Sequence, residues 1–539
     1  MPRPSDGPGL GEKILDRAYT PGRRELPALL DRLVRDEARR GAIETALLRA
    51  GPALGPPLLA RLGDGDGDDP ALLRLAGRLA AAGDEATFSA LLRALGATAP
   101  AARRTAIRAL GHLPPGDPRA ATAERALLQA WERGQELPEQ RALVEALGKV
   151  GGAPSRALFA SLTVDDGELR RRLGEARLRL GRGAAAAGTL DLEATLPRPV
   201  MVRAHCRRGL EEWLADELAD RRAKVVAPGV VELPFAGPLP SLFSARLWSA
   251  WGFLVAAGEG DLEARVIAAL TSPAAQAIFT AFTQGPPRYR LELPGGKRRA
   301  LTMAIAQAVA ARRPGLVNDP SARQWEVVVA PEGAIELCPR LDDPRFPWRQ
   351  ADVPAASHPT VAAALARVAG VRPEDVVWDP FAGSAGELCE RVRSGPWARL
   401  IASDLDAAAL AVAGQNLAAA GAQAELIVGD ALTLAPAGVT LILTNPPLGR
   451  RVHRAADLAP LLERFVLRAA TLLAPGGRLV WLSPAGERTA AAADRAGLHV
   501  ALRRPVDLGG FTVELQRFEK PRGTVRAAAA ARRRPTTEP

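Results

Sequence analysis

The sequence predicts a multidomain protein with an α-helical repeat array, then an α+β region, then an α/β Rossmann-like domain built on a parallel sheet. The last domain is predicted first, because two apolar runs, Val376–Asp379 and Leu441–Thr444, each lead into a turn rich in glycine or proline. Between them, two further apolar runs end at the acids Asp404 and Asp430. Strands followed by acids at this spacing indicate βα units, whose ligand binds at the carboxyl ends of the strands.

Length and composition indicate a folded protein of several domains. A chain of 539 residues is too long for one core, and 47% hydrophobic residues is typical of globular proteins. No apolar run reaches membrane-spanning length, and Met1–Asp6 lacks the apolar core of a secretory signal, so we expect no membrane partner and a cytoplasmic location. Cys206, Cys338 and Cys389 are scattered, so neither a disulfide framework nor a metal site is expected.

The net charge of +11 favours a polyanionic partner such as nucleic acid. However, nearly all the basic residues are arginine, and alanine, glycine and proline are abundant, as a GC-rich genome would also produce. The charge alone is therefore only modest support for an RNA partner.

The first part of the chain has a repeating helical pattern. Residues 1–11 are rich in proline and glycine and are expected to be disordered, whereas 12–190 has helical periodicity. Three segments resemble one another: Arg104–Gly111, Arg141–Gly148 and, more loosely, Arg172–Gly181. A spacing of roughly 30–40 residues is typical of stacked helix pairs, and the region resembles a HEAT-type array. The alternative is an irregular helical domain; either would bind RNA or a protein partner.

Residues 198–345 read as an α+β region. A strand at Val200–His205 leads into a helix at Leu210–Leu218, and Trp325–Val329 with Ala334–Leu337 reads as a hairpin. Through Gly209-Leu210-Glu211 and the hairpin, the region resembles the N-terminal half of THUMP-domain RNA methyltransferases. The resemblance implies a THUMP-like, ferredoxin-like fold that binds RNA, with the basic turn Lys297-Arg298-Arg299 as a candidate contact.

The glycine turn and the two acids predict a nucleoside pocket. Gly383 lets the backbone approach a ligand, and the helix that starts near Glu387 directs its amide dipoles at it. Asp404 lies about 20 residues further on, where an acid accepts hydrogen bonds from a ribose diol. Asp430 is placed to accept from an adenine amino group. Each acid alone reads as a helix cap, but the ordered set favours a pocket, and the lack of Gly-Lys-Ser/Thr disfavours a nucleoside triphosphate.

The segment Asn445-Pro446-Pro447-Leu448 predicts the reaction class. Its prolines fix the backbone, so that a carbonyl and the Asn445 amide are held rigidly at the mouth of the sheet. These two acceptors suit the two hydrogens of an exocyclic NH2 group, and would turn the nitrogen lone pair towards an electrophile.

The order of these motifs resembles the amino-methylating class I S-adenosylmethionine (SAM) methyltransferases over 346–520. With Ser357-His358-Pro359 it resembles the THUMP-associated RNA guanine-N2 methyltransferases in particular. The resemblance implies SAM as cofactor, a flipped-out base and no metal. It assigns to cofactor binding Asp379, Phe381, Gly383, Ser384, Gly386, Asp404, Leu405, Asp430 and Ala431, and to catalysis Asn445, Pro446, Pro447 and Leu448. His358, followed by proline, is expected to be a helix cap or a pocket wall.

Two residues depart from the family pattern. Ala385 stands where a glycine is usual and would crowd the cofactor or shift the turn. Leu448 stands where many relatives have an aromatic residue, with an expected loss on the order of 1 kcal/mol of base stacking. Arg450, Arg451 and Arg454 are candidate phosphate contacts, with a solvated loop as the alternative, and 521–539 is expected to be a disordered basic tail.

These observations predict a SAM-dependent RNA methyltransferase that acts on the N2 amine of a guanine in tRNA or rRNA. A second hypothesis is methylation of DNA adenine N6 or of a protein amide by the same fold. A third, of another class, is a catalytically inactive scaffold in which the helical repeats carry the function.

Overall fold

The chain folds into two compact units in a computed structural model that describes residues 13–16, 18–63, 68–134, 136–183, 188–296, 298–354, 356–448 and 455–522. The first unit comprises Met1–Thr189, Gly258–Ser272 and Thr283–Trp325; the second comprises Leu190–Ala257, Pro273–Phe282 and Glu326–Pro539. The predicted domain 198–345 is therefore divided between the two units. The predicted disorder of 1–11, and of all but the first residues of 521–539, lies outside the described residues.

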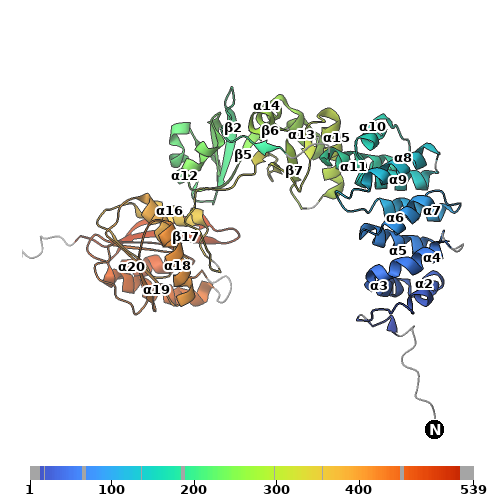
Figure 1. The fold of residues 1–539 in the computed structure, drawn as a ribbon. Coiled ribbons are helices and arrows are strands. Elements are labelled where there is room, and N and C mark those ends of the chain that lie inside the picture. Colours follow the sequence, from blue (N-terminus) through green and yellow to red (C-terminus); the bar gives the residue numbers. More distant parts are fainter. Residues whose placement is uncertain are drawn as a thin grey trace, which may run out of the picture. The chain divides into compact units, whose positions relative to one another are not determined.

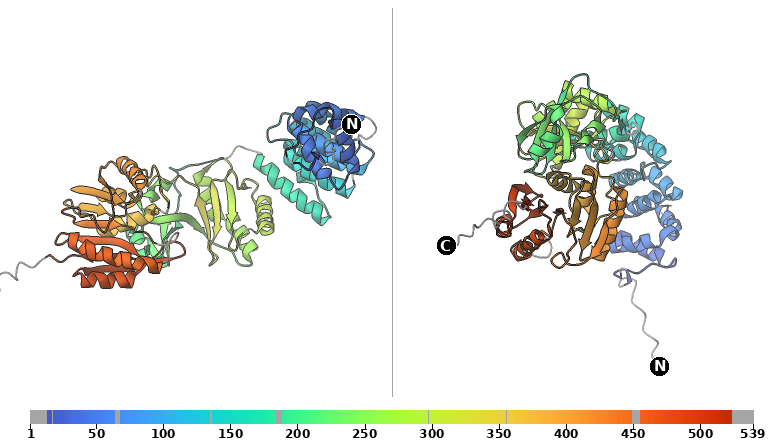
Figure 2. Two further views of the ribbon diagram at one scale, coloured as in Figure 1. Left: turned by 90° about the horizontal axis from the view of Figure 1, so that it is seen from below. Right: turned by 90° about the vertical axis from the view of Figure 1, so that its left-hand side faces the viewer.

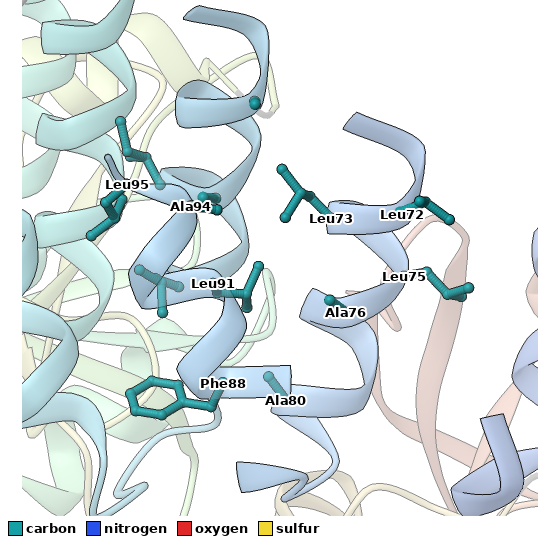
Figure 3. Close-up of a cluster of buried hydrophobic side chains, with 14 of the residues drawn as sticks. Leu72, Leu73, Leu75, Ala76, Ala80, Phe88, Leu91, Ala94 and Leu95 are labelled. Carbon is teal, nitrogen blue, oxygen red and sulfur yellow. The ribbon is translucent and has the colours of Figure 1, made fainter. Parts of the chain in front are cut away.

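Helices rich in leucine and alanine form most of the first unit (Figure 1). They are α2 (Leu26–Arg35), α3 (Arg40–Arg49), the 3-10 helix η1 (Gly51–Leu54), α4 (Gly55–Gly63), α5 (Pro70–Ala81), α6 (Glu85–Ala94), α7 (Pro100–Leu110), α8 (Ala120–Glu132), α9 (Leu137–Val150), α10 (Ala153–Ser161) and α11 (Gly167–Gly183). Their apolar faces share one core, part of which Figure 3 shows around α5 and α6. Burial of this continuous apolar face is the main stabilising contribution in this part of the chain.

Small residues let successive helices of this unit approach closely. A methyl group added at Gly77 of α5 would lie 2.7 Å from Ala109 Cβ of α7, and one at Gly148 of α9 would lie 2.6 Å from Ala176 Cβ of α11. Gly111, just after α7, approaches Ala146 of α9 in the same way. The glycines that end the first two of the three similar segments, Gly111 and Gly148, therefore mark contacts between helices, whereas Gly181 at the end of the third does not.

The remaining elements of the first unit follow this row of helices. They are α13 (Leu262–Thr271), β6 (Thr283–Gln284), β7 (Arg288–Glu292), α15 (Arg299–Arg312) and β8 (Val317–Asn318), and β7 and β8 pair in parallel. Gly174 of α11 leaves room for the Gln307 side chain of α15, and Arg182 Nε donates to the Asn318 carbonyl at 2.7 Å. These contacts tie α11 to the part of the unit that follows residue 258.

The second unit begins with an antiparallel sheet. Its strands and short helices are β2 (Val200–Cys206), α12 (Glu211–Glu217), η2 (Ala219–Arg221), β3 (Lys224–Ala227), β4 (Val230–Phe235), η3 (Leu239–Ser244), β5 (Trp248–Val255), β9 (Trp325–Val329) and β10 (Ile335–Pro339). β2 lies between β4 and β5, and β10 pairs with β5. Two short elements, β1 (Thr189–Leu190) and α14 (Pro273–Phe282), complete the region.

The rest of the second unit is the predicted α/β domain. Its seven-stranded sheet has the order β13-β12-β11-β14-β15-β17-β16, in which β13 to β15 are parallel and β17 is antiparallel to its neighbours. The strands are β11 (Val376–Asp379), β12 (Arg399–Asp404), β13 (Glu425–Val428), β14 (Leu441–Thr444), β15 (Arg478–Ser483), β16 (His499–Asp507) and β17 (Thr512–Glu519). β16 and β17 form an antiparallel pair at one edge of the sheet. The strand order reverses between β11 and β14, and ligands bind at such a point in open α/β sheets.

Helices cover both faces of this sheet (Figure 2). α16 (Pro359–Ala369), α17 (Gly386–Ser394) and α18 (Ala407–Ala419) pack in succession, while α19 (Ala455–Leu472) and α20 (Gly486–Arg495) pack against each other. Phe465 of α19 contacts Trp378, Phe381 and Trp481 in the core beneath the sheet.

Among the described helices, none alone is long and apolar enough to cross a membrane, although α13 and α14 taken together reach that length and composition.

Candidate functional site

A cavity of about 380 Å³ lies at the carboxyl ends of β11, β12 and β14, inside the second unit. This volume falls within the range of small-molecule sites. Its walls are formed by Val353, Pro354, Ala356, Ser357, Pro380, Phe381, Ala382, Gly383, Ser384, Glu387, Asp404, Leu405, Gly429, Asp430, Ala431, Asn445, Pro447 and Leu461. The structure therefore brings together most of the residues predicted from the two motifs and the two acids.

The glycine turn and the first acid are joined directly. Gly383 has a φ of +51°, and its N–H donates to Asp404 Oδ2 at 2.9 Å. Asp404 Oδ1 accepts from the Asp406 N–H at 3.0 Å, so the carboxylate is fixed and keeps lone pairs for a ligand hydroxyl. Asp430 is exposed, and its Oδ1 accepts from the Leu432 N–H at 2.9 Å. Both acids thus lie on the cavity wall as acceptors.

Two acids lie at or beneath the floor of the cavity. Asp379 is fully buried; its Oδ1 accepts from Thr444 Oγ1 at 2.6 Å and from the Phe381 N–H at 3.1 Å. Burial and the nearby Glu387 raise the pKa of Asp379 well above its usual value, and burial also raises the pKa of Glu387. The pair favours a protonated acid or a cationic group at this end of the cavity.

Asn445 follows β14, whereas Asp404 and Asp430 lie at or just after the ends of β12 and β13, on the other side of β11. Asn445 is half-buried, and its Nδ2 donates to Ser357 Oγ at 2.8 Å. Its Oδ1 is buried, and no donor in the described part of the chain lies within hydrogen-bond distance of it. A buried acceptor of this kind is costly unless a ligand donor satisfies it.

Four predicted site residues lie off the cavity wall. Asp379 and Pro446 are buried, and Leu448 is half-buried beyond the wall. A side chain added at Gly386 would meet the Trp348 ring at 3.3 Å, so this glycine serves helix packing.

Ala385 takes the left-handed conformation that glycine favours, with a φ of +59°. Its methyl group is fully buried and does not line the cavity, so it neither crowds the cavity nor prevents the turn. His358 is the N-cap of α16, accepting from the Thr360 N–H at 3.3 Å, as predicted.

Sequence reasoning did not assign Glu387, Val353 or Asn416. Glu387 stands in the first turn of α17, and an acid just after a glycine turn is the signal that could have found it. Val353 belongs to the segment before α16, whose path over the cavity has no local sequence signal. Asn416 of α18 holds that segment, because its Oδ1 accepts from the N–H groups of Gln350 and Ala351.

The predicted RNA contacts fall mostly outside the structure. Lys297, Arg450, Arg451 and Arg454 lie outside the described residues, whereas Arg298 and Arg299 are exposed at the start of α15. Within the described ranges, no group of His, Cys, Asp or Glu side chains could hold a metal ion.

Comparison with known proteins places this site in a class. Residues 347–513 match the family of RMKL-like methyltransferase domains. This part of the chain is therefore a methyltransferase domain.

Individual relatives are also similar to this chain. The chain is 35% identical over 153 residues to a tRNA (guanine(6)-N2)-methyltransferase of Thermus thermophilus, covering 28% of this chain and 45% of the relative. It is 40% identical over 98 residues to ribosomal RNA small subunit methyltransferase C of Pseudomonas paraeruginosa, covering 18% of this chain and 28% of the relative. The crystal structure of TrmN from Thermus thermophilus aligns with a TM-score of 0.49 at 26% identity, over 60% of this chain and 99% of that one. The chain thus spans less than half the length of these two curated relatives.

Proposed function

We propose that this protein is a SAM-dependent RNA methyltransferase that acts on the exocyclic N2 amine of a guanine in tRNA or rRNA. The observation that carries the proposal is one cavity lined both by nucleoside-type acceptors, Asp404 and Asp430, and by Asn445, whose Oδ1 is buried. The names of the two relatives, one a guanine-N2 tRNA methyltransferase and one a ribosomal RNA methyltransferase, support RNA as the substrate.

The cavity residues fit SAM. Asp404 would hold the ribose hydroxyls and Asp430 the adenine amine, while the Gly383–Ser384 turn would lie along the methionine part. The buried acids Asp379 and Glu387 would favour its cationic end. When bound, SAM supplies an electrophilic methyl group.

The Asn445 side chain and the Pro446 carbonyl would orient the target amine. Asn445 Oδ1 accepts one amine hydrogen and the carbonyl accepts the other, so the nitrogen lone pair turns out of conjugation with the ring. Holding the nucleophile in this orientation lowers the activation barrier, since the reacting atoms are already aligned when the substrate binds. Pro447 is exposed at the rim, where the flipped base enters.

The other regions would bind the substrate. We propose that residues 198–345 contain a THUMP-like RNA-binding region, to which the basic turn at Arg298 and Arg299 contributes. The row of helices from α2 to α11 would be a HEAT-like array that adds surface for RNA or a protein partner.

The test is methyl transfer by purified protein from labelled SAM to RNA from cells that lack the enzyme. Wild type should label RNA, and mass spectrometry of nucleosides should show N2-methylguanosine. Asn445→Ala should abolish transfer while SAM binding by calorimetry stays within about threefold. Normal transfer by Asn445→Ala would refute the assigned chemistry. Labelling of DNA or protein in place of RNA, or absence of SAM binding at millimolar concentration, would refute the RNA methyltransferase assignment.

A further inference from the structure

Three rigid elements meet behind Asn445. Ser357 immediately precedes α16, whose start is fixed by the His358 cap, and Glu387 lies in the first turn of α17. Asn445 directly follows β14. α16 and α17 pack closely, because a Cβ at Gly386 would lie 3.6 Å from the Ala362 methyl group. The relative positions of the three side chains are therefore set by secondary structure.

The three side chains form one hydrogen-bond chain. Ser357 Oγ donates to Glu387 Oε1 at 2.5 Å, and Asn445 Nδ2 donates to Ser357 Oγ at 2.8 Å. Glu387 is 4% exposed, so water competes little for this bond. Both Ser357 and Glu387 also line the cavity.

The acid gives this chain its direction. A serine hydroxyl has a single hydrogen, so once it donates to Glu387 it can only accept from its other neighbour. The group it accepts from must be the NH2 end of the Asn445 amide. The amide is thereby turned with its Oδ1 away from Ser357, and this is the buried oxygen that lacks a donor among the described residues.

The direction matters because the two ends of an amide have opposite roles. An exocyclic NH2 group offers two donors, and only the oxygen end of Asn445 can accept one of them. If the amide were rotated by 180°, it would present its own NH2 to the substrate amine, and no hydrogen bond would form.

We infer that Ser357 and Glu387 are positioning residues: their hydrogen-bond chain turns the Asn445 amide so that its oxygen, and not its nitrogen, faces the target amine. The inference rests on the proposed function, and it adds that the acceptor at this site is selected by two residues that need not touch the reacting atoms.

A double-mutant cycle tests the inference. Ser357→Ala removes the partner that sorts the two ends of the amide, so kcat for RNA should fall about tenfold or more, with SAM binding within threefold. Ser357→Thr keeps the hydroxyl and should restore most of the rate. Asn445→Asp presents an oxygen in either orientation and should retain measurable transfer. In the Asn445→Asp background, Ser357→Ala should therefore change kcat by less than about twofold.

Further variants sharpen the cycle. Glu387→Gln keeps the size of the side chain but can donate as well as accept. At saturating SAM it should lower kcat by a larger factor with Asn445 than with Asn445→Asp. Ser394→Ala, on the same helix, removes a hydroxyl that donates only to the Glu390 carbonyl at 2.8 Å, and it should leave kcat unchanged.

The outcomes separate the two proposals. An equal fall in kcat for Ser357→Ala in both backgrounds, with an active wild type, would show that Ser357 has only a structural role and would overturn the inference alone. A wild type that transfers no methyl group to RNA would overturn the proposed function and this inference with it.

Discussion

Asp379 and Asp375 stand at opposite ends of β11, both fully buried, but their surroundings shift their pKa values in opposite directions. Burial and Glu387 raise the pKa of Asp379 well above its usual value. Burial would also raise that of Asp375, but hydrogen bonds from Arg478 and Arg391 lower its pKa to about 2. The first carboxyl lies by the cavity and the second joins helices to the sheet, so function and stability use the same residue type differently.

Because the pKa of Asp379 is raised, Asp379→Asn should be more stable than wild type, and this difference should grow as the pH rises. An acid with a raised folded pKa favours the folded state below its unfolded pKa, near 4, and this contribution is lost as the pH rises through the folded pKa. Asparagine keeps an oxygen for Thr444 and Phe381 but never ionises. The melting temperature should therefore increase by about 2–8 °C at pH 8 and hardly at all at pH 4, while SAM binding should weaken about tenfold.

Asp375→Asn is the matched control, with the opposite sign. An acid with a lowered folded pKa stabilises above its unfolded pKa, and this stability is lost as the pH falls through about 2. The variant should melt well below wild type at pH 8, and the gap should narrow in acid. Thermal melting of both variants across pH checks the pair; a gain for Asp379→Asn that does not depend on pH would contradict the electrostatic explanation.

At the scale of elements, the close helix contacts of the first unit predict which glycines cannot be replaced. Gly148→Ala would place a methyl group 2.6 Å from Ala176 Cβ and 2.9 Å from its Cα, so α9 and α11 must separate. We expect a loss of about 1–3 kcal/mol in the free energy of unfolding, as for overpacked cores.

Gly181→Ala, inside α11, has nothing within 4 Å of the added methyl group and is the control. It should stabilise by about 0.5–1 kcal/mol through helix propensity alone. Urea denaturation followed by far-UV circular dichroism measures both. Similar effects of the two substitutions would show that helix spacing is not set by these glycines.

The proposed RNA binding predicts phosphate contacts at a cavity of about 280 Å³ beside α11. It is lined by Glu145, Arg171, Arg172, Glu175, Ala176, Arg179 and Arg299. Arg171 and Arg172 are neutralised by ion pairs, but Arg179 and Arg299 are exposed and form no ion pair within the described part of the chain.

Arg179→Glu with Arg299→Glu should weaken RNA binding about tenfold or more at low salt. The slope of log affinity against log salt should become shallower by about two, since two phosphate contacts are lost. Arg74→Glu with Arg78→Glu, two exposed arginines of α5, makes the same charge change away from the cavity. Filter binding with tRNA compares the pairs; equal losses would indicate that only net charge matters.

The elements of the α/β domain could be predicted from sequence because each is a local pattern. Apolar runs end at Asp404 and Asp430, and Gly383 and Pro446 mark turns. These local patterns predict the strands, their sequence along the chain and most of the residues of the cavity wall. Ala385 shows where local residue preferences fail. Alanine normally avoids the left-handed conformation, but tertiary packing of the turn outweighs this preference and holds Ala385 in it. The Ser357–Glu387 contact joins residues 30 apart in sequence, and the division of 198–345 between two units depends on distant packing. No local pattern encodes either.

For the whole molecule, a buried ion pair in the second unit joins the segment before β5 of the antiparallel sheet to α17 of the methyltransferase domain. Arg246, just before β5, donates to both Glu390 oxygens at 2.8 and 2.7 Å, and Trp348 Nε1 donates to Glu390 Oε1 at 2.6 Å. Glu390 is 2% exposed, so its charge depends on these donors. Arg246 also lies 4.6 Å from the centre of the Phe346 ring. The antiparallel sheet and the methyltransferase domain are thereby fixed to each other.

Arg246→Ala should therefore destabilise the second unit strongly, because it leaves an uncompensated buried carboxylate. The expected loss is about 3–5 kcal/mol, and Glu390→Gln in the same chain should recover part of it. Arg367→Ala is the control, since Arg367 pairs with Asp216 across the same two regions but both side chains are substantially exposed, and its loss should not exceed about 1 kcal/mol. The transition of this unit in urea is the one that S-adenosylhomocysteine should shift, which separates it from that of the first unit. If Arg246→Ala and Arg367→Ala lower the free energy of unfolding of this unit equally, burial does not set the strength of this junction. The Arg246–Glu390 pair would then not fix the antiparallel sheet to the methyltransferase domain.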